Sequence, residues 1–501
     1  MCGIIGIIDP DSSGAGSTSF GPAYQVYRGL MSLQHRGQDA AGILAYDSRL
    51  KRFVMEKDLG LVTQVFDQKT VERLTGHMAI GHTRYATAGT DGDRDVQPMI
   101  TGVPFGFGMA HNGNILNYFS LVDELAAQYG RQMLTSNDLE VMMHYWGLYL
   151  LDGAATPNEK TFGFDNIKKA AARLFDTLVG GYAAVTLMAD GGLIAFRDPQ
   201  GIRPLGIGIK ETSADNAYCV ASETSAMHAL GFTYLRDVAA GEVVHIDSAG
   251  NMQSAVVAKG KAAAPCMFEW VYFSGADSSI DKHPVYAVRL KLGERLAEKA
   301  QAKIKAGEMA PDVVMPVPDT SRPAAITIAD TLKLPYREGM IKNRYVARSF
   351  ILATQEMREA AVEQKLSPVL SEIEGRSIFL IDDSIVRGTT CRKIVDLLKK
   401  HGAKEVTLGI TCPPIRYACY YGIDFPDPAT LIAHERSIEE IEEYLGVEKL
   451  IYLDEEDLRI ATGMSELCMA CLNNKYPTAV TEGARFSKSR QRLRAVGGGK
   501  A

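Results

Sequence analysis

The chain has 501 residues, a formal net charge of -6 and 46% hydrophobic residues. Its length favours about three domains of ordinary size. The acidic balance argues against a general nucleic-acid or membrane-surface binder, and no apolar run approaches the roughly 18 residues of a membrane span. Eight cysteines are too few for a disulfide scaffold in a chain of this length, so we expect thiols or metal ligands in a cytoplasmic protein.

The first chemical signal is Cys2, which directly follows the initiator methionine. A small second residue usually permits removal of that methionine, and a terminal cysteine then carries its thiol beside a free α-amine. With a reference pKa of about 8, this amine can act as the general base, directly or through a water. A cysteine at this position means little alone. Four later segments strengthen the prediction, because each combines glycine-permitted turns with polar groups suited to a small zwitterion: QHRGQDAAG (34–42), GHTRYATAG (81–89), AHNGNI (110–115) and SNDLE (136–140).

Together with Cys2, these segments resemble the class II glutamine amidotransferases, whose glutaminase domain belongs to the N-terminal nucleophile hydrolases. The resemblance implies that Cys2 is the nucleophile. It assigns Arg84 to the α-carboxylate of glutamine, a bidentate role suited to guanidinium, and Asp138 to the α-ammonium. The side-chain amide of Asn112 and the backbone N–H of Gly113 would form the oxyanion hole.

Three further residues receive roles from the same resemblance. Thr87 is an additional expected contact to glutamine. Arg36 and Tyr85 are candidates to couple this site to a second one, and a purely structural hydrogen bond is an equal alternative for both.

The predicted glutaminase domain covers residues 2–258. Residues 180–198 alternate apolar runs with glycines, as a strand, a tight turn and a second strand would. With the segments 196–205 and 220–224, this stretch resembles the later sheet of the same domain. The family implies a four-layer α/β/β/α sandwich, whereas periodicity alone predicts only mixed α and β structure.

A junction and a second domain follow. Residues 259–265 (KGKAAAP) are the predicted linker, and the aromatic segment 266–281 is expected to pack between domains. The second domain is predicted over residues 266–471 and a C-terminal tail over 472–501. Helical periodicity runs from 288 to 305. For the basic stretch 485–494, a frayed terminus is favoured over an interaction segment.

The stretch SIFLIDDSIVRGTT (377–390) carries the second chemical signal. Four apolar residues predict a buried strand that delivers Asp382 and Asp383 to its carboxyl end. Gly388 frees the backbone for close approach to a ligand, and Thr389 and Thr390 stand where a helix begins, which favours phosphate binding. Two carboxylates repel an anion unless sugar hydroxyls or Mg²⁺ engage them.

This pattern resembles the phosphoribosyl pyrophosphate (PRPP) loop of type I phosphoribosyltransferases, α/β domains with a parallel sheet. The resemblance implies PRPP contacts from Asp382, Asp383, Ser384, Arg387, Gly388, Thr389 and Thr390. One Mg²⁺ per subunit would be held by Asp382, Asp383 and Ser321, the last from the segment 312–321. Lys342, Tyr345 and Arg348, in KNRYVARSFI (342–351), would belong to a mobile lid over PRPP, with a solvated basic loop as the alternative.

Cysteines supply the third signal, because Cys468 and Cys471 form a C-x-x-C pair. Alone, such a pair is compatible with redox chemistry, zinc binding or chance. With Cys266 and Cys419, it resembles the ligand segments of the iron-sulfur subclass of glutamine PRPP amidotransferases, which implies one [4Fe-4S] cluster per subunit. Cys412 is the nearest competitor to Cys419 as a ligand.

The combined resemblance extends from Cys2 to about Thr478. It implies hydrolysis of glutamine and transfer of the ammonia to PRPP, giving 5-phosphoribosylamine, glutamate and pyrophosphate in the first committed step of purine synthesis. It also implies purine nucleotide feedback inhibitors and a homotetramer, with no nucleic-acid or membrane partner. The alternatives are an amidotransferase like glucosamine-6-phosphate synthase, which needs sugar-isomerase domains, and a PRPP-sensing purine regulator, which has no use for Cys2.

Overall fold

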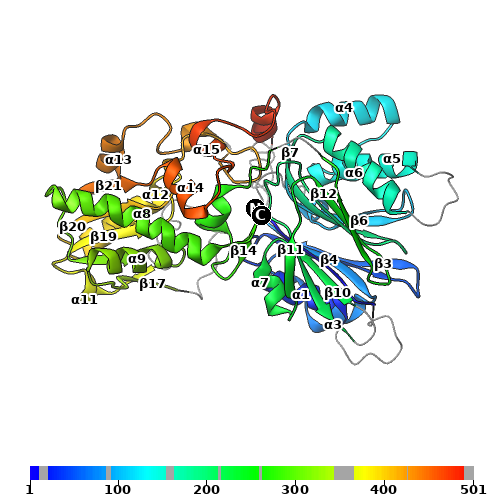
Figure 1. Cartoon of the computed structure of the whole chain (residues 1–501), viewed down its shortest axis with the longest axis horizontal. Coiled ribbons are helices and arrows are strands. Elements are labelled where there is room, and N and C mark those ends of the chain that lie inside the picture. The colour runs from blue at the N-terminus through cyan, green and yellow to red at the C-terminus, as the bar shows by residue number, and fades with distance from the viewer. Residues whose placement is uncertain are drawn as a thin grey trace.

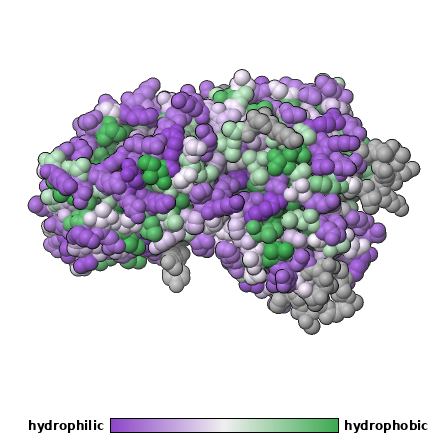
Figure 2. Space-filling model, viewed as in Figure 1, coloured by the Kyte–Doolittle hydropathy of each residue, from purple (hydrophilic) through white to green (hydrophobic). Residues whose placement is uncertain are grey.

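The computed structural model describes residues 1–10, 21–85, 92–153, 163–212, 216–258, 262–343, 366–425 and 427–489. Two lobes lie side by side, and the N-terminus lies between them (Figure 1). The visible face of the molecule is largely hydrophilic, with separate hydrophobic patches over both lobes (Figure 2). No helix in the described ranges has the length and apolar content needed to cross a membrane.

The first lobe contains two antiparallel sheets that pack face to face. The seven-stranded sheet has the order β11-β9-β10-β1-β4-β2-β3, and the six-stranded sheet has the order β13-β12-β8-β7-β6-β5. The strands of the first sheet are β1 (Gly3–Ile8), β2 (Ala40–Asp47), β3 (Arg52–Leu59), β4 (Met78–Arg84), β9 (Gly206–Glu211), β10 (Asn216–Ala221) and β11 (Thr233–Asp237). Those of the second are β5 (Met99–Thr101), β6 (Phe107–Ile115), β7 (Gly180–Met188), β8 (Gly192–Arg197), β12 (Glu242–Ile246) and β13 (Met252–Val256).

Helices cover the outer faces of both sheets. Those over the first sheet are α1 (Pro22–Ser32), α2 (Val62–Val65), α3 (Gln68–Arg73) and α7 (Thr224–Ala229), and those over the second are α4 (Tyr118–Tyr129), α5 (Asp138–Gly153) and α6 (Phe164–Thr177). Three apolar cores result, one between the sheets and one beneath each helical layer. Inner strands such as β1 are buried on both faces, which explains its continuous apolar sequence. The predicted four-layer sandwich is confirmed.

The second lobe is built on a parallel sheet of order β16-β19-β20-β21. Its strands are β16 (Val313–Pro316), β19 (Ser377–Asp382), β20 (Glu405–Ile410) and β21 (Lys449–Tyr452). Helices α8 (Val285–Lys305), α9 (Arg322–Leu332) and α14 (Glu455–Thr462) form one packed group, and α12 (Thr389–Lys400) and α13 (Ile438–Leu445) another. Parallel strands place their carboxyl ends at one edge, which is where ligands bind in such sheets.

Short elements complete the second lobe. They are a π-helix at Glu269–Phe273, β14 (Ser279–Ile280), β15 (His283–Pro284), β17 (Met340–Lys342), β18 (Leu366–Pro368), α11 (Leu370–Ile373) and α15 (Ala470–Asn473). Of the predicted linker, residues 259–261 lie outside the described ranges. In the aromatic segment after it, Phe268 and Trp270 are buried in the core of the second lobe, whereas Tyr272 is 40% exposed.

The C-terminal segment 482–489 packs on the first lobe. The carboxylate of Glu482 accepts hydrogen bonds from the backbone N–H groups of Phe119 (3.2 Å) and Ser120 (3.4 Å), at the start of α4. Arg485 lies over the ring of Phe119, and Phe486 is only 2% exposed. The expected frayed terminus is therefore wrong for residues 485–489, because an acidic helix cap and an aromatic anchor hold them. Residues 490–494 lie outside the described ranges.

Candidate functional site

Cys2 lies where the two sheets of the first lobe approach the second lobe. Gly3 at the start of β1 pairs with Thr83 of β4, which brings Cys2 beside Arg84 at the end of that strand. From the other sheet, Asn112 of β6 accepts a hydrogen bond through Oδ1 from the backbone N–H of Cys2 (3.2 Å). Residues far apart in the sequence thus line one pocket: Cys2, Arg84, Tyr85, Asp95, Gln97, His111, Gly113, Asn114, Ser136, Asn137 and Asp138.

The predicted oxyanion hole has an available donor. Asn112 is 1% exposed, and its Nδ2 has no hydrogen-bond partner among the described residues. Leaving such a donor buried and unpaired costs about 1–3 kcal/mol, which a bound oxyanion would recover. Gly113 has a φ of 143°, and a Cβ on it would lie 2.0 Å from the carbonyl oxygen of Gly181. Only glycine fits at this point of β6.

Asp138 is held at the start of α5 by two groups of the first lobe. The backbone N–H of Ile115 donates to its Oδ2 (2.8 Å), and Nε2 of His111 lies 3.6 Å from its Oδ1. Gln97 fixes this histidine, because its Oε1 accepts from the His111 backbone N–H (2.8 Å) while its Nε2 donates to the ring Nδ1 (2.9 Å). The ring proton is therefore on Nε2, which faces Asp138.

Arg84 faces a buried carboxylate across the same pocket, with Nη2 3.6 Å from Oδ2 of Asp95. Asp95 also accepts from the backbone N–H (3.2 Å) and the hydroxyl (2.8 Å) of Ser136. This pairing holds the guanidinium at the pocket wall, where the family resemblance predicts a contact with the α-carboxylate of glutamine. Tyr85 lines the pocket as well. The predicted contact Thr87 lies outside the described residues.

Arg36 joins Cys2 to the second lobe. Its Nε donates to the carbonyl oxygen of Cys2 (3.0 Å), and its other nitrogens bind Glu223 (2.5 Å) and Glu269 (2.9 Å). Burial opposes ionisation of Glu223, but the charge of Arg36 outweighs it and holds the pKa of Glu223 well below its usual range. Because Glu269 belongs to the π-helix of the second lobe, Arg36 physically connects the two lobes.

Met1 is buried, with 2% exposure, and belongs to the same apolar cluster as Cys266. Burial lowers the pKa of its amine to about 5. While Met1 is present, the nitrogen of Cys2 is a peptide N–H and cannot act as a base. Removal of Met1 would convert this nitrogen, already beside Asn112, into the free amine that the sequence predicts.

The second candidate site lies at the carboxyl edge of the parallel sheet. Burial and the neighbouring charge of Asp383 raise the pKa of Asp382 well above its usual value. Burial also raises the pKa of Asp383 to about 6, although the hydroxyl of Ser384, which donates to it (2.7 Å), and the charge of Arg289 oppose this rise. Two adjacent carboxylates that resist ionisation favour a bound cation or hydrogen-bond donors.

The loop before α9 reaches this acid pair as predicted, since the hydroxyl of Thr320 bonds to Asp383. Ser321 is buried, and its hydroxyl donates to the carbonyl oxygen of Val317 (2.5 Å), which leaves its oxygen lone pairs for a further ligand. Asp319 pairs with Arg322 (2.5 Å) and with Lys342 (3.1 Å), one of the predicted lid residues. Tyr345 and Arg348 lie outside the described residues.

The rest of the predicted PRPP loop opens α12. Gly388 is the residue before the helix and has a φ of 78°, which glycine adopts without strain. Thr389 and Thr390 form the first turn and are exposed, as is Arg387. The predicted strand, acid pair, turn and helix start are therefore confirmed in this order.

The four predicted cluster cysteines converge at the junction of the lobes. The backbones of Cys266 and Cys468 form an isolated β-bridge. The backbone N–H of Cys419 donates to the carbonyl oxygen of Phe425 (2.9 Å), which closes the loop between these residues. Burial raises the pKa of the Cys471 thiol, and the nearby sulfurs of Cys419, Cys266, Cys412 and Cys468 raise it further. Cys412 therefore lies near the group and remains a competitor to Cys419.

The guanidinium of Arg203 lies beside these thiols. Burial raises the pKa of Cys266 to about 11, whereas Arg203 acts in the opposite direction. Among the described residues, no group of three or more His, Cys, Asp or Glu side chains is arranged so that it could hold a metal ion.

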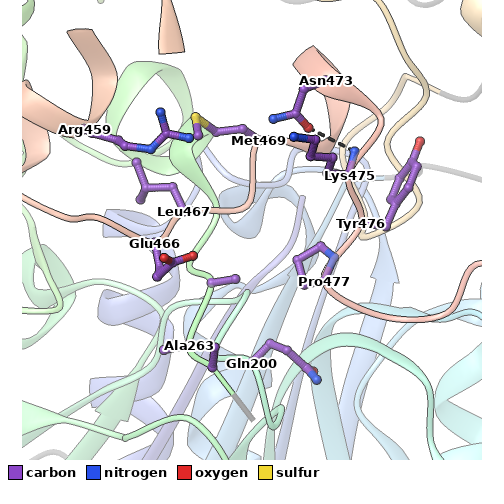
Figure 3. Close-up of a pocket in the computed structure, with 12 residues that line it drawn as sticks. Gln200, Ala263, Arg459, Glu466, Leu467, Met469, Asn473, Lys475, Tyr476 and Pro477 are labelled. Atoms are coloured by element: carbon purple, nitrogen blue, oxygen red, sulfur yellow. Dashed lines mark hydrogen bonds between the residues drawn. The ribbon is translucent and has the colours of Figure 1, made fainter. Parts of the chain in front are cut away.

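A pocket opens beside the cysteine group (Figure 3). Leu467 and Met469, the neighbours of Cys468 in the chain, line it together with Gln200 of the first lobe and Tyr476. The cysteine group therefore lies next to a cavity at the junction of the lobes.

Sequence reasoning missed several residues of the glutamine pocket, among them Asp95, Gln97, His111 and Asn114. His111 and Asn114 flank the predicted oxyanion residues in the segment 110–115, so an alternating pattern on β6 could have indicated Asn114. Nothing in the sequence around Gln97 indicates its contact with His111.

The first lobe carries a pocket with Cys2 in a four-layer sandwich, and the second carries an acid pair at the edge of a parallel sheet. Together they define the class: a glutamine amidotransferase joined to a phosphoribosyltransferase. Family models agree with this class. Residues 82–229 match the glutamine amidotransferase domain, and residues 289–422 match the phosphoribosyl transferase domain.

Relatives extend the likeness over the whole chain. The amidophosphoribosyltransferase of Pseudomonas aeruginosa is 41% identical over 464 residues, 92% of this chain and 89% of the relative. The one of Archaeoglobus fulgidus is 39% identical, covering 96% and 98%. A solved glutamine PRPP amidotransferase from B. subtilis, complexed with ADP and GMP, superimposes with a TM-score of 0.82 at 38% identity, covering 96% and 98%. The chain belongs to the amidophosphoribosyltransferase family, the glutamine-dependent transferases of purine biosynthesis.

These relatives decide between the functions weighed from the sequence. They are named amidophosphoribosyltransferases, and this chain itself matches a phosphoribosyl transferase domain, which excludes an enzyme like glucosamine-6-phosphate synthase and a non-enzymatic PRPP sensor.

Proposed function

We propose that Cys2, Arg84, Asn112, Gly113 and Asp138 form the glutaminase site of this enzyme. With Met1 removed, the α-amine of Cys2 takes the thiol proton, and the sulfur attacks the carboxamide carbon of glutamine. The Nδ2 of Asn112, which has no partner in the described structure, donates to the developing oxyanion together with the N–H of Gly113. This unsatisfied buried donor beside the nucleophile is the observation that carries the proposal.

Substrate orientation follows from the two charged walls of the pocket. The carboxylate of Asp138, fixed by His111 and Ile115, receives the α-ammonium of glutamine. The guanidinium of Arg84 receives the α-carboxylate. Ammonia leaves as the thioester forms, and water then releases glutamate.

The acid pair of the second lobe is the proposed PRPP site. Asp382 and Asp383 would bind the ribose hydroxyls, and the N-terminus of α12, with Ser384, Arg387, Gly388, Thr389 and Thr390, would bind the 5-phosphate. When bound, Mg²⁺ would neutralise the negative charge of the pyrophosphate. Asp382, Asp383 and Ser321 are the residues that would hold this Mg²⁺. The raised pKa of both carboxyls supports this assignment, because a cation would stabilise the ionised forms that burial disfavours. Lys342, Tyr345 and Arg348 are the proposed lid residues.

A glutamate assay tests the two sites separately. The wild type should release glutamate and pyrophosphate when glutamine, PRPP and Mg²⁺ are all present. Cys2→Ala should lose glutamine hydrolysis and keep pyrophosphate release from PRPP with ammonium salts. Normal glutamine hydrolysis by Cys2→Ala would overturn the assigned nucleophile, and absence of pyrophosphate in the wild type would overturn the second site.

We further propose that Cys266, Cys419, Cys468 and Cys471 hold a [4Fe-4S] cluster. The four thiols converge, they are not paired in disulfides, and Arg203 offers positive charge to anionic sulfur. In such a cluster each cysteine would bind a different iron. The cluster would join the chain segments around residues 266, 419 and 468–471.

Anaerobic iron and sulfide analysis tests this cluster. Cys468→Ser should lose iron, sulfide and the brown colour, while Cys391→Ser, a buried thiol without a role in the group, should keep all three. Cys419→Ser and Cys412→Ser decide between the two competing ligands. Zinc without iron in the wild type would contradict the assignment.

Regulation, assembly and location remain proposals drawn from the family. Because a structural relative was solved with ADP and GMP, we propose that purine nucleotides inhibit this enzyme as well. The homotetramer is testable by mass measurement in solution. A cytoplasmic location remains a prediction from the sequence.

A further inference from the structure

Asn114 has a buried side-chain oxygen that no group in the described part of the chain satisfies. It lies on β6 two residues after Asn112, so both side chains project from the same face of the strand. Asn114 is 8% exposed, and its Oδ1 has no hydrogen-bond partner among the described residues. It lines the pocket that contains Cys2.

The orientation of this side chain is fixed from the second lobe. Its Nδ2 donates to the carbonyl oxygen of Tyr420 (2.9 Å). A carbonyl oxygen only accepts, so the amide nitrogen must face Tyr420 and the amide oxygen must point elsewhere. A buried acceptor without a donor is costly, and a ligand that brings an N–H would remove this cost.

The atoms of glutamine leave one candidate for that donor. The α-ammonium is assigned to Asp138, and the α-carboxylate and the carboxamide oxygen are acceptors, which suit Arg84 and Asn112. The carboxamide nitrogen is the remaining group with hydrogens to donate. Resting on the glutaminase site proposed above, we propose that Asn114 Oδ1 accepts a hydrogen bond from the carboxamide nitrogen and then from the ammonia that it becomes.

The reaction keeps this hydrogen bond possible throughout. The C–S bond forms and the C–N bond breaks, while the nitrogen keeps its two hydrogens and gains the thiol proton by way of the α-amine. Neutral ammonia leaves with three N–H bonds. A donor is therefore available to Asn114 before and after the bond breaks.

The position of Asn114 also suits the direction in which ammonia must travel. The side-chain Nδ2 of Asn114 is bound to Tyr420 of the second lobe, so its Oδ1 lies at the boundary between the two lobes. Next to it, Gly422 packs on the backbone of Gly113, since a Cβ built on Gly422 would lie 3.6 Å from the Cα of Gly113. Asn114 would retain ammonia at the boundary where it passes to the acid pair.

The experiment measures pyrophosphate and glutamate in the same sample with glutamine, PRPP and Mg²⁺. The wild type should give a ratio near one. Asn114→Ala should lower the turnover of glutamine about tenfold and the ratio of pyrophosphate to glutamate about threefold, because ammonia escapes. Pyrophosphate release with ammonium salts measures the transferase site of the same sample. Asn114→Ser, in which the hydroxyl is too short to replace the amide oxygen, should show the same losses if Asn114→Ala does not fold.

Tyr476→Phe is the matched control for loosened packing. The hydroxyl of Tyr476 donates to the carbonyl oxygen of Ala418 (2.7 Å), and its ring stacks on Tyr420 (5.1 Å), so this variant loosens the same loop and leaves Asn114 intact. Its ratio should stay near one. A normal ratio and turnover in both Asn114 variants, or an equal loss in Tyr476→Phe, would overturn the proposal. Glutamine hydrolysis by Cys2→Ala would instead show that the glutaminase site itself is misplaced.

Discussion

The glutamine pocket around Cys2 and the second site around Asp382 and Asp383 differ in how completely the charged side chains are paired within the protein. In the pocket, Asp138 accepts a hydrogen bond from Ile115 and faces His111 at 3.6 Å, and Arg84 faces Asp95. At the second site, burial raises the pKa of both Asp382 and Asp383, the charge of Asp383 raises that of Asp382 further, and Lys342 forms an ion pair with Asp319. The first site is arranged before its substrate arrives, whereas the second needs a cation and a ligand to complete it.

The supporting elements explain this difference. Asn112, Gly113 and Arg84 lie on strands inside a four-layer sandwich, and Asp138 opens a long helix. Asp383, Thr320 and Lys342 lie after or at the ends of strands, where loops converge on the sheet edge. Strands hold side chains more precisely than loops, and loops can close over a ligand.

Removing one carboxylate of the acid pair should have the largest effect. Asp382→Asn should lower turnover at least about 10³-fold with either glutamine or ammonium salts, because sugar positioning and charge neutralisation are both lost. Pyrophosphate release measures both reactions. Asp396→Asn, on the exposed side of α12, is the control and should retain wild-type rates. Loss with glutamine alone would show that Asp382 does not act in the transferase step.

Asn112→Ala should affect only the glutamine pocket. Without the Nδ2 donor, the turnover of glutamine should fall about 10²- to 10³-fold, as for other oxyanion-hole donors. The Michaelis constant for glutamine should change little, because the donor acts on the transition state. Ammonium-dependent pyrophosphate release separates this effect from misfolding, since it should stay near the wild-type rate. An equal loss in that assay would contradict the separation of the two sites.

The contrast between the sites also shows what the sequence could predict. The strand, acid pair and helix start at 377–390 were predictable, because the apolar run, Gly388 and the helical spacing are all local. The contacts of Arg36 with Glu223 and Glu269 were not, since they join residues 187 and 233 positions apart. The roles of Gln97 and Asn114 depend on which atom of an amide faces which neighbour, and no local pattern encodes that.

Low pH should weaken the junction between the lobes, because Glu223 pairs there with Arg36. Its pKa is lowered in the folded protein, so its stabilising contribution is complete above the unfolded value of about 4.5 and is lost as the pH falls below it. Glu223→Gln should reduce the free energy of unfolding by about 3 kcal/mol at pH 7, because Arg36 stays buried without this partner. Urea unfolding at pH 7 and pH 4 measures both effects. The variant should lose less stability between the two pH values than the wild type, and an identical loss would show that Glu223 is not the titrating group.

The smallest predicted effect concerns Gln97, which touches no substrate atom in the proposed site. Gln97→Ala releases the ring of His111, so the Nε2 proton no longer faces Asp138 and the carboxylate loses one of its contacts. Because Asp138 binds the α-ammonium in ground state and transition state alike, the Michaelis constant for glutamine should rise about tenfold while turnover changes little. Gln128→Ala, on the exposed face of α4, should change neither constant. If Gln97→Ala lowered turnover and left the Michaelis constant unchanged, then His111 would act on the reacting bond, and the glutamine pocket would be less complete without substrate than its hydrogen bonds indicate.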